Sequence, residues 1–159
     1  MIKRSEKLAF MQVKEGEEQV FKRMTGFTEL SVAKNPKEYS RKYIDEDMER
    51  SAVVGYSPAI SYKFDADPEN SVHQVFCNVA DRELTGADTE CCIVIADIST
   101  ADENGSCKAI MRSFCIIPSK EGDDKDTYTC SGSLKVAGEK IFGTAETSDN
   151  WQTITFTEE

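Results

Sequence analysis

The chain has 159 residues, a formal net charge of −10 and no apolar run approaching the roughly 20 residues that a membrane helix needs. Its apolar fraction of 39% and its dispersed aromatic residues exclude a disordered polymer and predict one folded domain over residues 1–159. Because the apolar runs are short, we expect no membrane insertion. The excess negative charge, most of it after residue 58, repels phosphate, so we expect no adhesive contact with nucleic acid.

Short segments of alternating polar and apolar residues, separated by Gly, Asp, Asn and Pro, predict a mostly β, largely antiparallel fold. Ile60, Tyr62 and Phe64, for example, place their side chains on one face of a predicted strand. Residues 91–96 and 109–117 are apolar at both parities, which predicts two central strands covered on both faces. The predicted strands are residues 8–13, 20–25, 27–33, 38–44, 58–65, 90–97, 107–118, 127–136 and 151–156.

The segment 45–57 has no clear period and predicts a long loop between two strands. Its first half is charged and its second half offers exposed apolar residues, a composition typical of a segment that binds another molecule. A hairpin arm lying on its own domain is the alternative that the sequence leaves open.

One helix is predicted over residues 68–84, with Asp67 as the N-cap and Pro68 at the first helical position. Its apolar residues recur at helical spacing and form one stripe that should pack on a sheet. His73, the only histidine, lies on the flank of this stripe. Because no nucleophile motif accompanies it, we expect a hydrogen-bonded boundary histidine and not a general base.

The groups that catalysis or metal binding would need do not occur at recognisable spacing. The six cysteines contain no CxxC pair, and the apolar stretch at the N-terminus is too short for a signal peptide, so we expect reduced, mostly buried thiols, with disulfides as the alternative. Neither GxGxxG nor GxxxxGK[ST] is present. We therefore predict that the chain is not an enzyme and has no cofactor or metal site.

Three parts of the chain resemble tail tube proteins from phages and prophages of Gram-positive bacteria. They are residues 26–46 (GFTEL through NPKEY to KYIDE), residues 55–58 (GYSP) with the alternating strand after them, and residues 131–145 (SGSLKVAGEKIFGTA). The resemblance implies a β-sandwich or barrel of two packed antiparallel sheets with one flanking helix. It also implies a virion structural protein, also called a major tail protein, whose hexameric rings stack into a hollow conduit for DNA ejection. A secretion-system tube protein of related fold and a soluble β-sandwich binding module are the alternatives.

The same resemblance implies the partners and the location. The chain would bind copies of itself, together with tape measure, tail terminator and baseplate or tip proteins, in the virion tail and, during assembly, in the host cytoplasm. Its long loop corresponds to the one that reaches an adjacent ring, and the predicted contact residues are Asp47, Met48, Glu49, Arg50, Ser51, Ala52, Val53 and Val54. An acidic lumen would keep DNA from sticking, and Asp65, Glu90 and Asp97 are the predicted lumen-facing acids.

Overall fold

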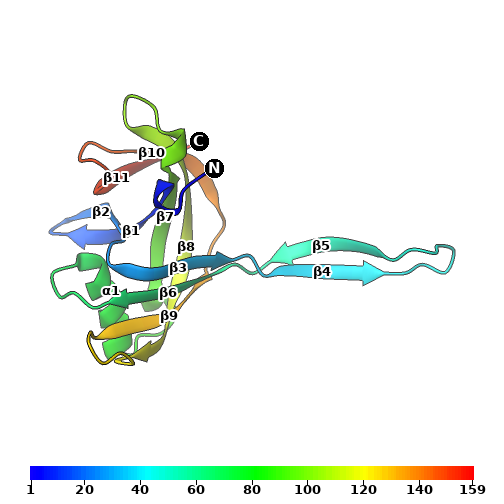
Figure 1. The fold of residues 1–159 in the computed structure, drawn as a ribbon, viewed down its shortest axis with the longest axis horizontal. Coiled ribbons are helices and arrows are strands. Elements are labelled where there is room, and N and C mark those ends of the chain that lie inside the picture. The colour runs from blue at the N-terminus through cyan, green and yellow to red at the C-terminus, as the bar shows by residue number, and fades with distance from the viewer.

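The computed structural model describes residues 1–159, and its regular structure consists mostly of strands (Figure 1). The strands are β1 (Lys7–Glu15), β2 (Glu18–Arg23), β3 (Phe27–Ala33), β4 (Pro36–Arg41), β5 (Arg50–Tyr56), β6 (Ala59–Asp65), β7 (Glu90–Asp97), β8 (Ser106–Glu121), β9 (Thr129–Val136), β10 (Ile141–Glu146) and β11 (Thr153–Glu158). The helices are α1 (Ser71–Asp81) and the short 3-10 turns η1 (Arg4–Glu6), η2 (Gly86–Thr89) and η3 (Ile98–Thr100). None of these helices has the length and apolar character of a membrane-crossing segment.

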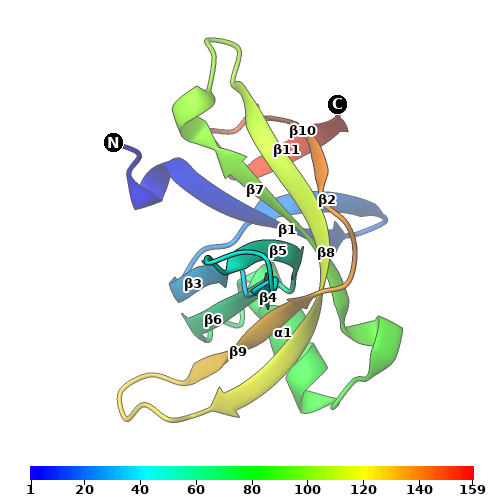
Figure 2. The ribbon, with the colours of Figure 1, turned by 90° about the vertical axis from the view of Figure 1, so that its right-hand side faces the viewer.

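Six strands close into an antiparallel barrel. The nine-stranded sheet has the order β10-β11-β2-β1-β7-β8-β9-β6-β3, and β10 pairs additionally with β8, so β1, β2, β7, β8, β10 and β11 form a ring (Figure 2). Closure is possible because β8 has 16 residues: its first part pairs with β10, as in Cys107 opposite Ala145, and its second part pairs with β9. The barrel interior is filled by Phe10, Val94, Ala96, Cys107, Ala109, Ala145 and Ile154.

A second core lies on the other face of β1, β7 and β8. There the sheet continues through β9, β6 and β3, and α1 packs against it with Val72, Phe76 and Val79. The predicted barrel form with one flanking helix is confirmed. The barrel and its extension belong to one continuous sheet, however, and are not two separate packed sheets, because β8 is long enough to serve both.

The strands with apolar residues at both parities are the central ones, as predicted. In β7, Val94 points into the barrel while its neighbour Ile93 points into the second core. In β8, Ala109 belongs to the barrel interior and Phe114 to the core beneath α1. Successive side chains of a strand alternate in direction, so a strand between two cores needs apolar residues on both faces.

The helix is shorter than predicted, and its cap is a different residue. It begins after Asn70, whose side-chain oxygen accepts hydrogen bonds from the backbone N–H groups of Val72 and His73. The expectation that Asp67 caps the helix is therefore wrong. Asp67 instead accepts a hydrogen bond from the N–H of Glu69 and shapes the turn that leads into α1. An Asx turn and an N-cap use the same local chemistry, so the sequence pattern alone did not separate them.

The predicted loop 45–57 is half strand. Residues 50–56 form β5, which pairs with β4 in a two-stranded ribbon with the register Tyr39 opposite Ala52 and Arg41 opposite Arg50. Only residues 42–49 remain as the connecting turn. The ribbon projects away from the barrel and does not lie on its own domain (Figure 1). We call β4, β5 and their connecting turn the arm.

Candidate assembly surfaces

The arm is held to the rest of the molecule only at its base. There, Asn35 and Ser57 are joined by the backbone hydrogen bond from Ser57 N–H to Asn35 O (3.2 Å) and by the bond from Asn35 Nδ2 to Ser57 O (3.0 Å). Along the ribbon every residue of β4 is exposed, and so is every residue of β5 except Gly55, which is half-buried. A two-stranded hairpin is marginally stable by itself in water, so this ribbon is suited to bind a surface outside its own chain.

Apolar side chains are concentrated on this exposed arm. Seven of the thirteen large hydrophobic residues that are exposed in the molecule lie in residues 36–56: Tyr39, Tyr43, Ile44, Met48, Val53, Val54 and Tyr56. Ile44 and Met48, both in the connecting turn, are among the most exposed of them. Exposed apolar side chains gathered on one segment indicate a protein interaction site more often than single scattered ones do.

The turn at the end of the arm is acidic. The turn holds four carboxylates, and one of them, Glu46, forms a bidentate ion pair with Arg50. The Arg50 Nε lies 2.7 Å from one carboxylate oxygen and Nη2 lies 2.5 Å from the other. Asp45, Asp47 and Glu49 form no ion pair within the chain. We call these three residues the acidic tip.

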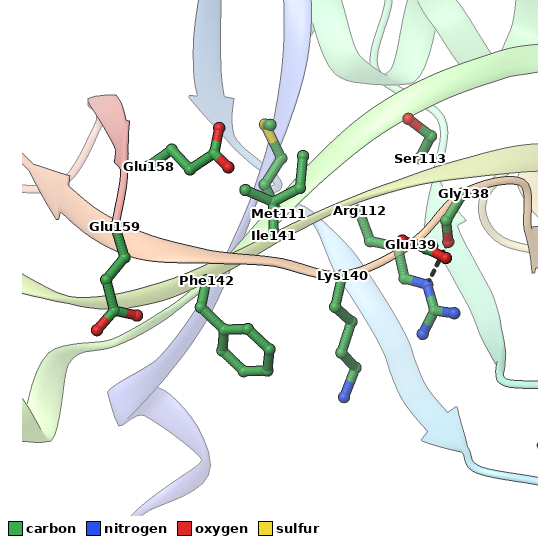
Figure 3. Close-up of a pocket in the computed structure, with 10 residues that line it drawn as sticks. All are labelled: Met111, Arg112, Ser113, Gly138, Glu139, Lys140, Ile141, Phe142, Glu158 and Glu159. Carbon is green, nitrogen blue, oxygen red and sulfur yellow. Dashed lines mark hydrogen bonds between the residues drawn. The ribbon is translucent and has the colours of Figure 1, made fainter.

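A basic hollow lies at the opposite end of the arm, where the arm meets the barrel. It has a volume of about 590 Å³ and is lined by Lys34, Tyr56, Pro58, Arg112, Glu139 and Lys140. A second hollow of about 580 Å³ shares the Arg112, Glu139 and Lys140 walls and is lined in addition by Glu158 and Glu159 (Figure 3). We call Lys34, Arg112 and Lys140 the basic cluster.

The basic cluster forms no ion pair within the chain. Arg112 donates its Nε–H to the carbonyl oxygen of Gly138 at 2.7 Å, which holds the guanidinium at the hollow, and its side chain and that of Lys140 extend to the same side of the chain that leads into β10 (Figure 3). None of the three cations lies within ion-pair distance of a carboxylate, although Glu139 lines the same hollow. Partial burial lowers the pKa of Lys140, and the nearby Lys34 and Arg112 lower it further.

The predicted contact residues are placed together on the arm. Asp47, Met48 and Glu49 lie in the connecting turn, whereas Arg50, Ser51, Ala52, Val53 and Val54 form the first part of β5, and all eight are exposed. Their role as contacts stays a prediction. The basic cluster was not singled out from the sequence, because its members come from three segments that only the fold brings together.

The predicted lumen acids are not gathered on one surface. Glu90 and Asp97 lie at opposite ends of β7, about 20 Å apart at the usual rise of a strand. Asp97 has partners within the chain: it accepts hydrogen bonds from the hydroxyl and the N–H of Ser99 and lies 3.1 Å from Lys7 Nζ. The Ser99 hydroxyl and Lys7 are the main causes that lower its pKa. Asp65 ends β6 and accepts a hydrogen bond from the Thr127 hydroxyl at 3.0 Å. Their lumen-facing role stays a prediction.

An unpaired sheet edge adds a further surface. β3 is the last strand of the large sheet, and an apolar groove of about 320 Å³ separates it from β1. Arg4 spans this gap, since its guanidinium donates to the carbonyl oxygens of Lys7 (2.7 Å) and Leu30 (3.0 Å). An unpaired edge offers backbone donors and acceptors to a strand of another molecule.

The side chains that could be reactive or bind a metal ion have structural roles. All six cysteines are free: Cys107 and Cys130 are buried and the other four are half-buried. His73 is 1% exposed, so it is a core residue and not a boundary one, and both ring nitrogens have partners. No group of three or more His, Cys, Asp or Glu side chains is arranged to hold a metal ion.

Comparison with known proteins identifies a likeness of fold. No family model matches the sequence, and no curated protein matches it. Among solved structures, the chain is similar to one in the cryo-EM structure of the anti-feeding prophage (AFP) baseplate, 6-fold symmetrised, with a TM-score of 0.51 and 11% identity. The alignment covers 86% of this chain and 91% of the other. This likeness is one of fold: a chain of that prophage baseplate structure has a similar fold.

Proposed function

We propose that the protein is a virion structural protein: a tail tube subunit that assembles as stacked hexameric rings around a hollow conduit for DNA ejection. The observation that carries this proposal is the arm, which projects from a closed barrel, exposes a cluster of apolar side chains and has no partner within its own chain. A segment of that kind gains stability only when a second molecule covers it.

The likeness to the prophage baseplate chain supports the same proposal. It extends over nearly the whole of both chains, and the particle to which the neighbour belongs was treated as six-fold symmetric. The unpaired edge of β3 would allow lateral contact between subunits, since pairing of strand edges removes exposed backbone groups. Tape measure, tail terminator and baseplate or tip proteins are the further partners that a tube subunit would meet.

The negative charge of the chain suits a conduit for DNA. A wall rich in carboxylates repels phosphate, whereas each basic contact would release counterions and add affinity that slows passage. The proposed role is accordingly non-catalytic, with transient and non-adhesive passage of DNA. The protein would assemble in the host cytoplasm and would be located in the tail of the finished virion.

A subunit of a baseplate ring is the second candidate, because the similar chain belongs to a baseplate structure. The two candidates differ in whether rings stack. Negative-stain electron microscopy of the concentrated purified protein tests both: stacked rings with a central channel are expected of a tube subunit, and single rings of a baseplate subunit. Small discrete particles at every salt and protein concentration would exclude both and favour a soluble binding module.

A further inference from the structure

The arm carries opposite charges at its two ends. The acidic tip holds three carboxylates without an ion pair, and the basic cluster at the base holds three cations without one. Only four of the 19 lysine and arginine side chains form an ion pair within the chain, so the lack of a pair is common here. What distinguishes the arm is that like charges are gathered at each of its ends. Unpaired charges gathered in a hollow are arranged for a charged partner.

The two ends cannot meet within one chain. β5 runs from the tip at Arg50 to the base at Tyr56, which places the two ends about 20 Å apart at the usual rise of a strand. The ribbon is kept extended by its ladder and by the hydroxyl contact between Ser40 and Ser51 at 2.9 Å. A contact between tip and hollow therefore requires two molecules.

We infer that the acidic tip of one copy of this chain docks into the basic hollow at the arm base of a second copy. The match is one of sign, since three free carboxylates meet a hollow that holds three cations and one carboxylate, Glu139. The wall residue Tyr56 is 64% exposed and offers an aromatic surface to the apolar residues that flank the tip, Ile44 and Met48. This inference deepens the proposed function by naming the surface that receives the arm.

The contact joins two different patches of the same protein, which makes it heterologous. Heterologous contacts close into rings or propagate into filaments, depending on the rotation between subunits. A tip that docks in a neighbour's hollow thus leaves that neighbour's own tip free for the next copy. Continued addition of subunits needs no other surface chemistry.

Charge reversal tests the inference in the full-length protein. One variant carries Asp45→Lys, Asp47→Lys and Glu49→Lys at the tip, and a second carries Lys34→Glu and Lys140→Glu in the hollow. Arg112 is left unchanged because its bond to Gly138 O supports the fold. The matched control carries Lys14→Glu and Lys125→Glu, two exposed lysines outside the hollow.

Each reversed variant alone is expected to lose self-association in sedimentation velocity, while the control keeps it. An equimolar mixture of the two variants should form complexes, because one supplies an intact tip and the other an intact hollow. Affinity in the mixture should fall on the order of tenfold from low to high salt. A chain that carries both reversals should associate again.

Zero-length carbodiimide cross-linking of the wild type identifies the contact directly. We expect bonds between tip carboxylates and Lys34 or Lys140, which the length of the arm forbids within one chain. The inference is overturned if the mixture forms no complex, or if the tip carboxylates are linked only to other lysines. Stacked rings seen together with either result would leave the tube proposal intact. Complexes and cross-links without any ring or tube would instead uphold the tip contact and refute the tube.

Discussion

His73 on α1 donates its Nε2–H to the carbonyl oxygen of Thr25 across 2.7 Å, joining the helix to the turn between β2 and β3. The Asp67 backbone N–H donates to Nδ1 at 3.2 Å, so the neutral ring with its proton on Nε2 satisfies both contacts. The ring also stacks on Phe64 at 4.3 Å and leaves no room at Gly26, where a Cβ would lie 2.9 Å from the imidazole. The one histidine is therefore a structural residue of the second core.

Stability should fall as the pH drops below the ordinary histidine pKa. Burial lowers the pKa of His73 from 6.5, because a protonated ring would be desolvated, and it would also lose the Asp67 N–H as a donor. The unfolded chain then binds a proton at higher pH than the folded one. The contribution of His73 is fully present above pH 6.5 and is lost between that value and the lowered folded pKa.

Each pH unit between the two pKa values is worth about 1.4 kcal/mol. Urea unfolding from slightly alkaline to mildly acidic pH measures the effect, and the His73→Gln variant is the control because the chain has no other histidine. A wild-type profile as flat as that of the variant over this range would contradict the prediction.

Gly132 should tolerate no side chain. A Cβ at this position in β9 would overlap the carbonyl oxygen of Ile117 and lie 2.8 Å from the hydroxyl of Tyr62, a buried core residue. We expect Gly132→Ala to destabilise the fold by about 1–3 kcal/mol, the usual cost of overpacking. Gly55→Ala is the matched control, since a Cβ there meets nothing within 4 Å. Equal unfolding free energies for the two variants would refute the assigned packing.

The thiols of Cys91 and Cys130 should react slowly in the folded protein. Burial raises the pKa of each to about 12, so the reactive thiolate is scarce at neutral pH. We expect modification on the order of a thousandfold slower than in the unfolded chain. Mass spectrometry after timed alkylation, with and without denaturant, assigns the rate to each cysteine. Rapid labelling of either thiol in the native state would show that the second core is open.

Removal of the arm's turn should leave the fold unchanged and abolish assembly. Arg41 and Arg50 are directly paired, so replacing residues 42–49 by Asn-Gly closes the ribbon with a two-residue hairpin turn. The unfolding free energy should change by less than about 0.5 kcal/mol, because the removed turn lies at the far end of the arm, away from the barrel (Figure 1). Sedimentation and electron microscopy measure assembly.

A second variant, in which the same eight residues are replaced by an eight-residue Gly-Ser loop, keeps the length of the arm but removes its side chains. Assembly should be lost there as well, because the acidic and apolar side chains are gone although the reach is kept. Rings that form equally well in either variant would mean that residues 42–49 are not the contact.

The candidate site was foreseen in part. The exposed apolar and acidic character of residues 45–54 is local and readable in the sequence, although β5 was missed because its run from Arg50 to Tyr56 alternates only weakly. The basic cluster had no sequence signal, since Lys34, Arg112 and Lys140 lie far apart along the chain. β10 was missed for a related reason: its short run is defined by pairing with β8 and β11 rather than by its own pattern.

The sequence by itself determined the local chemistry: the alternation that makes strands, the double-sided apolar runs of β7 and β8, and the acidic, partly apolar segment that became the arm tip. Only the tertiary structure decided that β8 serves two neighbours in succession, which closes the barrel and opens a second core beneath α1. It also decided that the arm projects, with free carboxylates at one end and free cations at the other. Strand pairing and charge clustering join residues that are distant in sequence. The periodicity within a segment does not predict which residues those partners are.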